Sequence, residues 1–510
     1  MNGIVRKSSV SSSFQREWRG RSVAVRAIWL CAILICGSWM ARAQTSKPAP
    51  AATATATAKP KEKVSLLIEG GTVVTMDATR RVITDGAIAV RGDTIVAVGS
   101  RAELEARYLP VRRISAQGRL VMPGLINGHA HAAMTLLRGI ANDVTLQDWL
   151  NNYIFPAEAR NVTEQFVADG TRLGVLEMMR GGITTYVDMY YFEDTVARVT
   201  KAAGMRGILG ETLLDFPAPD NKTMPQALAY TEKYLQTWKG DPLIVAAVAP
   251  HSIYTASEQT LRSAAELARR YDAPIVIHVA ETKKELDDSL AKNLATPVAY
   301  LDHIGFLGPD VIAAHCVWVN AADIQLLAQR HTGCVHNPSS NMLLASGVAP
   351  VGAMLDAGLA VGLGTDGAAS NNDMDLMREM DLAAKLQKIS KMDPRALTAQ
   401  QAVEMATIGG ARAIHMDKEI GSLEAGKKAD FIVLDLDAPH AVPLYDLYGQ
   451  IVYSLNASDV RTVVIGGRIV MQDRRVLTLN QPAIVATAKV WGLRVQKSLA
   501  TPPAPAAALN

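Results

Sequence analysis

Pro123-Gly124-Leu125-Ile126-Asn127-Gly128-His129-Ala130-His131 is the stretch on which the interpretation of this chain rests. Its apolar start and its two histidines at positions i and i+2 are typical of a buried strand that ends at His131. Alternate residues of a strand point to the same side, so both imidazoles can reach one point in space. Imidazole is a good ligand for a borderline divalent metal, and two on one rigid element form half of a site. Taken alone, the pair is also compatible with two polar residues in a loop.

Seven more strands are expected downstream, separated by amphipathic helical segments such as 163–179 and 257–269. The eight strands end near His131, Asp188, Glu211, His251, His278, His315, His336 and Asp366. Eight βα units predict an α/β fold, a (β/α)8 TIM-type barrel over residues 122–417, with its active site at the C-terminal ends of the strands. A doubly wound open sheet is the alternative, but it would keep the first and eighth strand ends apart.

Short β-rich segments flank this barrel. Residues 64–121 and 418–480 each contain runs of β-branched and apolar residues, with Gly70-Gly71 and Gly466-Gly467 as turns. Neither segment has enough strands to close a core alone. We therefore expect the two to pair into one small β-sandwich. Residues 481–510 form a C-terminal tail with an amphipathic helix expected at 484–499.

Residues 1–43 have the layout of a secretory signal peptide. Several basic residues precede the apolar run Ala27–Ile35, and Ala41-Arg42-Ala43 follows as a small-residue cleavage site. We expect an exported protein, periplasmic or extracellular, with a membrane anchor formed by the uncleaved leader as the alternative. Residues 44–63 are rich in Ala, Thr, Pro and Lys and are expected to be a flexible linker.

The charge of the chain does not indicate a nucleic-acid partner. The leader holds seven Lys or Arg residues and one Glu, which leaves 45 basic and 48 acidic residues and a net charge of −3. We expect a small-molecule substrate, no nucleic acid, and no stable membrane partner after leader removal. A homo-oligomer is compatible with the sequence. Of the four cysteines, only Cys316 and Cys334 lie beyond the leader, as two buried thiols or one bridge.

Two other strand ends supply residues that complete a metal site. His278 follows the apolar run 274–277, and Asp366 follows the run 360–365. With His129 and His131 they give three imidazoles and one carboxylate, as in catalytic zinc sites that keep positions for water and substrate. We expect one divalent ion, with Zn²⁺ as the first choice and Fe²⁺ or Mn²⁺ as alternatives. Taken singly, His278 and Asp366 are also compatible with capped loop residues.

Glu281, His315 and Asp366 are the candidates for catalysis. A bound divalent ion makes hydroxide available near neutral pH, and attack on an sp² carbon also needs a proton donor for the substrate. Glu281 lies three residues after His278 and can supply that proton, although a helix N-terminal acid is the structural alternative. His315 can hydrogen-bond the attacking water or polarise the substrate. Asp366 can orient the water while it binds the metal.

The ordered set of motifs resembles the amidohydrolase superfamily. The motifs that carry the resemblance are 123–131, His278-Val-Ala-Glu281, His315-Cys316, His336-Asn-Pro-Ser-Ser-Asn341 and Gly364-Thr-Asp-Gly-Ala-Ala-Ser-Asn371. Within the superfamily, residues 64–476 are similar to the 5-methylthioadenosine/S-adenosylhomocysteine deaminases and the related triazine hydrolases. The resemblance implies zinc, or iron in some members, a barrel with a β-sandwich, and hydrolytic release of ammonia from an adenine C6.

Three more positions resemble the substrate pocket of the nucleoside deaminases. Glu158 matches the acid that holds the ribose hydroxyls, and Trp149 matches the Trp that packs on the nucleoside. His251 matches a substrate-binding His on the fourth strand. Glu281 is expected to contact the substrate as well. Without the resemblance, Glu158 is equally compatible with a surface helix acid and Trp149 with core packing.

One departure from the family concerns the substrate. Members that accept homocysteine nucleosides carry an Arg after the third strand, where this chain has Gly210-Glu211-Thr212. Lys222 is the candidate substitute, but Lys does not match Arg in binding a planar carboxylate. The hypothesis is a deaminase of 5-methylthioadenosine, adenosine or 5-deoxyadenosine, with S-adenosylhomocysteine disfavoured. The alternatives are an amino- or chlorohydrolase of a triazine or other heterocycle and, more remotely, a non-catalytic metal- or solute-binding protein.

Overall fold

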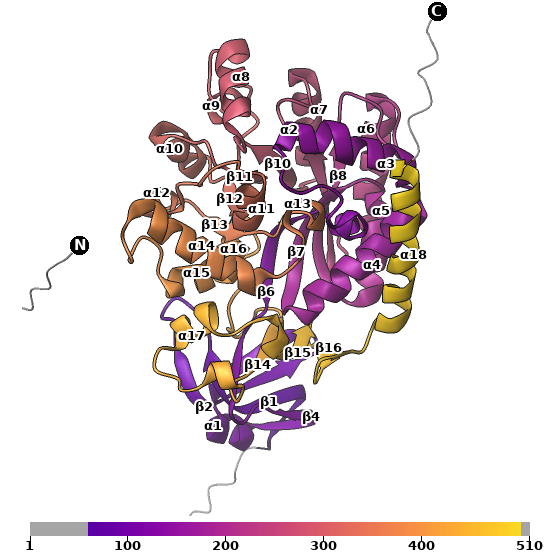
Figure 1. Ribbon diagram of the computed structural model, residues 1–510. Helices are drawn as coiled ribbons and strands as arrows, with labels where there is room; N and C mark the ends of the chain where they lie inside the picture. Colours follow the sequence, from indigo (N-terminus) through magenta and orange to yellow (C-terminus); the bar gives the residue numbers. More distant parts are fainter. Residues whose placement is uncertain (1–59, 501–510) are drawn as a thin grey trace, which may run out of the picture. The chain divides into compact units, whose positions relative to one another are not determined.

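The structure is a computed structural model that describes residues 60–500. In this part of the chain, eight parallel strands close into a barrel, with β13 pairing back to β6 (Figure 1). The strands are β6 (Leu125–Ala130), β7 (Ile183–Tyr190), β8 (Arg206–Leu213), β9 (Ile244–Pro250), β10 (Ile275–Val279), β11 (Val311–His315), β12 (Gly333–His336) and β13 (Val361–Leu363). Each ends within three residues of its predicted end, and the predicted (β/α)8 fold is confirmed.

Helices follow the strands and cover the outside of the barrel (Figure 1). The longer ones are α4 (Glu164–Arg180), α5 (Glu193–Ala203), α6 (Met224–Trp238), α7 (Glu258–Arg270), α8 (Lys283–Asn293), α10 (Ala321–Gln329) and α14 (Leu376–Lys391). The shorter ones are α9 (Pro297–His303), α11 (Pro338–Leu343), α12 (Val351–Asp356), α13 (Ala368–Asn371), α15 (Ala399–Ala406) and α16 (Ile408–Ala413). Thr163, Thr223 and Ser257 begin α4, α6 and α7 because their hydroxyls accept otherwise unpaired backbone N–H groups.

A longer excursion separates β6 from β7. It contains the 3-10 helix η1 (Ala132–Leu137), then α2 (Leu146–Asp148), η2 (Trp149–Ile154) and α3 (Phe155–Asn161). Connections of this length in a compact domain commonly form part of a binding site. Trp149 and Glu158 lie on this excursion, which places both above the C-terminal ends of the strands.

Side-chain hydrogen bonds close the barrel between its first and last strands. Asn127 in β6 donates to Thr365 Oγ1 over 2.7 Å and accepts from the Thr365 backbone N–H over 3.0 Å. The next backbone N–H, that of Asp366, donates to the carbonyl of His129 over 3.0 Å. Gly364 permits this approach, because a Cβ there would lie 2.3 Å from Asn337 Oδ1 and 2.9 Å from the His129 nitrogen. The chain is thereby held with Asp366 beside the histidines of β6.

The two flanking segments combine into one module, as predicted. Within residues 60–500, a sheet of nine strands joins them, and its junction is the antiparallel pair of β5 with β14. The strands are β1 (Glu62–Val74), β2 (Val82–Arg91), β3 (Thr94–Ser100), β4 (Tyr108–Ser115), β5 (Arg119–Pro123), β14 (Phe431–Asp435), β15 (Val460–Ile465), β16 (Arg468–Gln472) and β17 (Arg475–Val476), and α1 (Arg101–Arg107) follows β3. The turn between β2 and β3 lies against the Gly467 region, so the sheet folds over an apolar interior that both segments fill.

One detail of this module differs from the sequence-based expectation. Gly70-Gly71 does not form a turn between two strands, because β1 continues through it. The pairing of β1 with β2 shifts register on both sides of Gly71, and Gly70 adopts a φ of +86°. Glycine reaches this conformation without the steric cost of a Cβ, so the strand bends here instead of ending.

The C-terminal helix α18 (Gln481–Ala500) lies alongside α4 (Figure 1). Ile484, Trp491 and Val495 are its buried residues, and the Trp491 indole donates to Asp169 over 3.0 Å. In residues 60–500, no helix combines the length and the apolar character that a membrane span requires. Both cysteines in this range, Cys316 and Cys334, are buried free thiols. The predicted signal peptide and all but the last four residues of the predicted linker lie outside the described residues.

Candidate metal and active site

Three histidines and one aspartate meet at the C-terminal rim of the barrel. His129 and His131 lie on or directly after β6, His278 lies in β10, and Asp366 follows β13. The Nε2 atoms of His129 and His278 are 3.1 Å apart. Oδ1 of Asp366 lies 3.5 Å from His129 Nε2 and 3.2 Å from His131 Nε2. The tertiary fold thus brings the four predicted ligands to one point.

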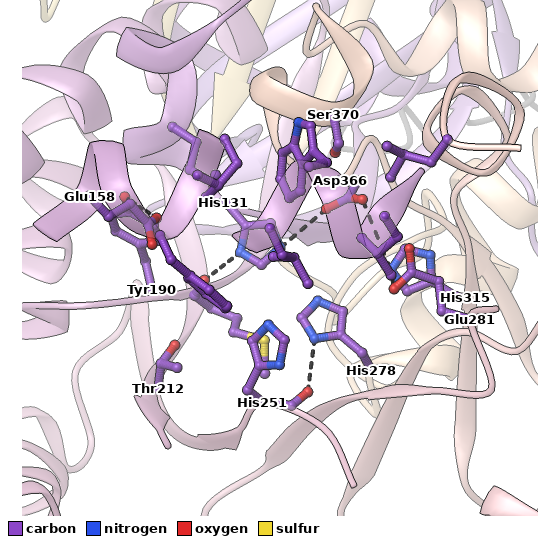
Figure 2. Close-up of a pocket in the computed structure, with 18 of the residues that line it drawn as sticks. His131, Glu158, Tyr190, Thr212, His251, His278, Glu281, His315, Asp366 and Ser370 are labelled. Carbon is purple, nitrogen blue, oxygen red and sulfur yellow. Dashed lines mark hydrogen bonds and ion pairs between the residues drawn. The ribbon is translucent and has the colours of Figure 1, made fainter. Parts of the chain in front are cut away.

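Backbone carbonyls orient two of these imidazoles. Nδ1 of His131 donates to the carbonyl of Met189 over 2.5 Å, and Nδ1 of His278 donates to the carbonyl of His251 over 2.8 Å (Figure 2). A carbonyl oxygen only accepts, so the hydrogen is assigned to Nδ1 in both rings. Nε2 of His278 then offers its lone pair to the shared point, as in histidines that bind metals, and Nε2 of His131 does so once it is deprotonated.

The charges at this point also fit a cation. Burial, followed by the neighbouring imidazoles, holds the pKa of His278 well below its ordinary value, so this ring is neutral. Burial opposes a charge on His131 too, but the Asp366 carboxylate outweighs it and raises the pKa of His131 to about 9. Positive charge is therefore stabilised beside Asp366, within a set of N and O donors that suits a borderline divalent metal.

Asp366 is held in one orientation as an ionised carboxylate. Its backbone has a left-handed φ of +60°, which turns the side chain toward the histidines. Ser340 Oγ donates to Oδ2 over 2.6 Å, and the Gly367 N–H donates to Oδ1 over 2.8 Å. Burial opposes ionisation, but hydrogen bonds from His129 and His131 hold the pKa of Asp366 well below its ordinary value.

Glu281 and His315 lie next to this cluster. Nε2 of His315 is 3.9 Å from Glu281 Oε2 and 4.0 Å from Asp366 Oδ2, while its Nδ1 faces Asn341 Oδ1 at 2.9 Å. His315 also groups with His129 and His278 as a set of atoms close enough to hold an ion. Burial raises the pKa of the Glu281 carboxyl. A carboxyl of raised pKa beside a hydrolytic centre is suited to proton transfer.

The predicted substrate residues line the same pocket. Glu158 on α3 is buried, and it accepts from the hydroxyls of Tyr190 over 2.8 Å and Tyr191 over 3.3 Å. Burial raises the pKa of Glu158 to about 7. Figure 2 shows Glu158 and Tyr190 on one side of the pocket and Glu281 and His315 on the other. Trp149 is buried beside them, on η2.

His251 contacts three neighbouring residues. Its carbonyl holds His278, and its Nδ1 lies 3.2 Å from Ser252 Oγ and 3.0 Å from Thr255 Oγ1. Burial lowers the pKa of His251 to about 3, so its ring is neutral. A neutral imidazole among apolar and aromatic groups can accept or donate a hydrogen bond to a bound base.

The pocket wall is largely apolar. Its other lining residues are Met134, Leu146, Leu150, Ile154, Phe155, Met189, Thr212, Tyr254, Leu344 and Ser370. None of the described residues that line the pocket is Lys or Arg. Lys222, the candidate substitute for the missing Arg, is outside the lining and donates to the carbonyls of Ala218 and Pro219 over 2.7 and 3.2 Å.

Sequence reasoning missed Tyr190 and Tyr191, the partners of Glu158. They lie two and three residues after Asp188, which the sequence marked as the end of the second barrel strand. Their position at the C-terminal end of a barrel strand, where active sites lie, could have identified them as pocket residues. Their hydrogen bonds to Glu158 could be found only in the tertiary structure, because that acid lies on a separate helix.

Comparisons with known proteins agree with this arrangement. The model of the amidohydrolase family matches residues 120–470, and one of the bacterial imidazolonepropionase-like composite domain matches residues 86–108. A 5-methylthioadenosine/S-adenosylhomocysteine deaminase of Syntrophus aciditrophicus is 47% identical over 86% of this chain and 100% of its own length. A 5'-deoxyadenosine deaminase of Methanosarcina mazei is 41% identical over 83% of this chain and 96% of its own length.

A solved structure is similar over the same range. The crystal structure of an adenosine deaminase from Xanthomonas campestris with bound zinc superposes with a TM-score of 0.84 at 39% identity. The match covers 86% of this chain and 100% of that one.

Proposed function

Because the chain belongs to the amidohydrolase family, we propose that it is a metal-dependent deaminase of an adenine nucleoside. The products are ammonia and the corresponding inosine analogue. The observation that carries this proposal is the pocket, where Glu158 lies opposite the catalytic group of Glu281, His315 and Asp366. One end thus suits a pair of sugar hydroxyls and the other a hydrolytic reaction.

His129, His131, His278 and Asp366 would hold one divalent ion, for which we propose Zn²⁺, with Fe²⁺ or Mn²⁺ as alternatives. The neutral ring of His278 and the ionised carboxylate of Asp366 support this assignment, and so does the zinc in the Xanthomonas campestris structure. Such an ion lowers the pKa of water toward neutrality and supplies a nucleophile at physiological pH.

The chain's own residues then divide the proton transfers among them. Asp366 and His315 face one point from two sides and orient the attacking water toward the adenine C6. Glu281, whose pKa is raised by burial, protonates N1 of the base. The ring of His251 lies across the pocket and contacts the base.

The pocket supports a small or uncharged 5' group on the nucleoside. Glu158 accepts from two neighbouring ribose hydroxyls at once, a task for which a carboxylate is suited. The apolar lining leaves a homocysteine carboxylate without a cationic partner, which is costly for a buried charge. We therefore propose 5-methylthioadenosine, adenosine or 5-deoxyadenosine as substrates in preference to S-adenosylhomocysteine.

We further propose that the protein is exported, on the basis of the leader sequence at residues 1–43. N-terminal sequencing of the protein recovered outside the cytoplasm should begin near Gln44. Recovery only with the intact leader in a membrane fraction would support the anchored alternative.

Glu158→Gln tests the nucleoside assignment. The metal-loaded protein is incubated with a panel of adenine nucleosides and with ribose-free heterocyclic amines, and released ammonia is measured. Gln keeps only one acceptor oxygen and carries no charge, so one hydrogen bond is lost and the other is weakened, which predicts a fall of about 100-fold in kcat/KM for nucleosides. Turnover of ribose-free amines is expected to be unaffected. Glu164→Gln, an exposed acid at the start of α4, is the control. Unchanged nucleoside turnover in Glu158→Gln would contradict the proposal.

A further inference from the structure

The carboxylate of Glu281 is not fixed by side-chain hydrogen bonds in the described structure. Among the described residues, its ion-pair partner is His315, whose Nε2 lies 3.9 Å from Oε2, beyond hydrogen-bond distance. The side chain is nevertheless buried among the pocket residues. Its position is therefore set by the backbone from which it projects.

That backbone has an unusual conformation. Ala280, between β10 and Glu281, has a left-handed φ of +51°. Residues with a Cβ rarely adopt this region, and at functional sites they do so only when the surroundings hold them there. The contacts around Ala280 must therefore be strong enough to select this turn over an ordinary one.

Glu285, in the first turn of α8, supplies one of these contacts. Its Oε1 accepts from the Ala280 N–H and its Oε2 from the Glu281 N–H, each over 2.9 Å. The side chain is 3% exposed, so water does not compete for these bonds. Burial raises the pKa of this carboxyl to about 7 against the opposing effect of the two N–H groups. Its two oxygens match two consecutive N–H donors. We call this arrangement, Glu285 with the N–H groups of Ala280 and Glu281, the carboxylate clamp.

The opposite side of the turn is tied to the neighbouring strand. The Ala280 carbonyl accepts from Val317 N–H over 3.1 Å and from Trp318 N–H over 2.8 Å. His315 and Cys316 are left-handed too, with φ of +74° and +47°. The turns that carry Glu281 and His315 are thus hydrogen-bonded to one another. The carboxylate clamp binds the Glu281 turn from its other side.

We propose that Glu285 is a positioning residue for the proton transfer by Glu281. The proposal rests on the proposed deaminase function. Glu285 does not line the pocket and acts on the reaction only through the Ala280–Glu281 backbone. Its loss should displace the Glu281 carboxyl. The metal ligands should stay in place, because other hydrogen bonds hold them, such as those from His278 to the His251 carbonyl and from Ser340 to Asp366.

Glu285→Gln is the test, because Gln keeps the size of the side chain but replaces one acceptor oxygen with an NH2 group. We expect kcat to fall by about 10- to 100-fold, as for other residues that orient a reacting group. KM and the bound metal per chain should stay within about twofold of the unsubstituted protein, since Glu285 touches neither the pocket nor the metal ligands. Asp287→Asn, an exposed acid of the same helix that pairs with Lys283, is the matched control.

A double-substitution cycle separates positioning from a general structural role. If Glu285 acts through Glu281, adding Glu285→Gln to Glu281→Gln should cause no further loss in kcat. A further loss equal to that in the unsubstituted background would overturn the proposal. So would a kcat of Glu285→Gln within twofold of the unsubstituted protein, or parallel losses of metal and kcat.

A readout without catalysis keeps this inference separate from the proposed function. Hydrogen exchange at the amides of Ala280 and Glu281 should be slow in the unsubstituted protein and faster in Glu285→Gln. Fast exchange of both amides in the unsubstituted protein would overturn the clamp, even if Glu285→Gln fails to fold. If no nucleoside releases ammonia while these amides are protected, the deaminase proposal fails and the clamp stands.

Discussion

Glu281 and Glu158 are two glutamates in one pocket whose surroundings give them different tasks. Burial raises the pKa of both, but Glu158 accepts from two tyrosine hydroxyls, whereas Glu281 faces His315 without a hydrogen bond. A carboxyl already engaged by donors is suited to binding hydroxyls. A carboxyl without such hydrogen bonds and with a raised pKa is suited to giving and receiving protons.

Glu281→Gln should therefore remove the proton transfer without emptying the pocket. We expect kcat to fall by about 10²- to 10⁴-fold, the usual contribution of a general acid or base, with metal content unchanged. Steady-state ammonia release and metal analysis on the same preparation measure both quantities. Unchanged turnover for every substrate would favour the non-catalytic metal- or solute-binding alternative.

Glu193 allows a pH prediction at the residue scale. Its side chain is fully buried beside Asp188, and burial, followed by the charge of Asp188 and a hydrogen bond to it, raises its pKa well above 4.5. The folded protein then binds this proton more tightly than the unfolded chain does. Stability contributed by the protonated form is complete below about pH 4.5 and is lost as the pH rises toward the folded-state pKa.

Glu193→Gln mimics the neutral acid and should weaken that pH dependence. The unsubstituted protein should lose free energy of unfolding between pH 5 and pH 8. The variant should lose less of it over the same range. Urea unfolding at the two pH values measures the difference. Glu266→Gln, at an exposed position, should leave the pH dependence unaltered, and an equal dependence in Glu193→Gln would refute the argument.

At the scale of elements, close backbone packing determines where the strand ends lie. β12 begins at Gly333, and a Cβ there would lie 1.7 Å from the Ala413 carbonyl oxygen at the end of α16. No side-chain rotation relieves a clash with backbone, so either β12 or α16 would have to move. His336 ends this strand, and Asn337, the next residue, contacts His315.

Gly333→Ala should consequently lower the free energy of unfolding by about 1–3 kcal/mol, the usual cost of overpacking. Gly352→Ala in α12 is the control, since its nearest atom is a carbonyl oxygen at 3.5 Å. Alanine favours helix there and should raise stability by up to about 1 kcal/mol. Thermal or chemical unfolding of both variants checks the pair, and equal effects would count against the packing argument.

At the scale of the whole molecule, a buried ion pair joins the barrel to the flanking sheet. Arg206, the first residue of β8, donates from Nε to Asp430 Oδ2 over 2.8 Å, and both side chains are at most 3% exposed. Asp430 also accepts from the Gly466 N–H over 2.6 Å. Figure 1 shows the sheet at the end of the barrel where β6 begins, opposite the catalytic rim.

Arg206→Ala should lower the free energy of unfolding by about 3–5 kcal/mol, because it leaves the Asp430 carboxylate buried without its cation. Arg395→Ala removes an exposed pair with Asp393 and should cost less than about 1 kcal/mol. Chemical unfolding followed by circular dichroism gives both values. Similar losses for the two variants would show that the buried pair does not couple the sheet to the barrel as argued.

The amino-acid sequence by itself determined the barrel and the places of the reacting groups. Strand ends marked by His131, His278, His315 and Asp366 could be read because parallel strands in a closed barrel bring all their C-terminal ends to one rim. The order of the motifs along the chain therefore sufficed to predict which side chains would meet. The pairing of the two flanking segments followed from the same logic, since neither could bury its apolar face alone.

Only the tertiary structure decided how those groups are held. The tyrosines that pair with Glu158, the carboxylate clamp at Glu285 and the contacts that lock Asp366 depend on side-chain directions and left-handed turns. The spacing of apolar residues in the sequence indicates which face of one helix or strand is buried. They do not report the angle at which separate elements approach, and that angle determines which donor meets which acceptor.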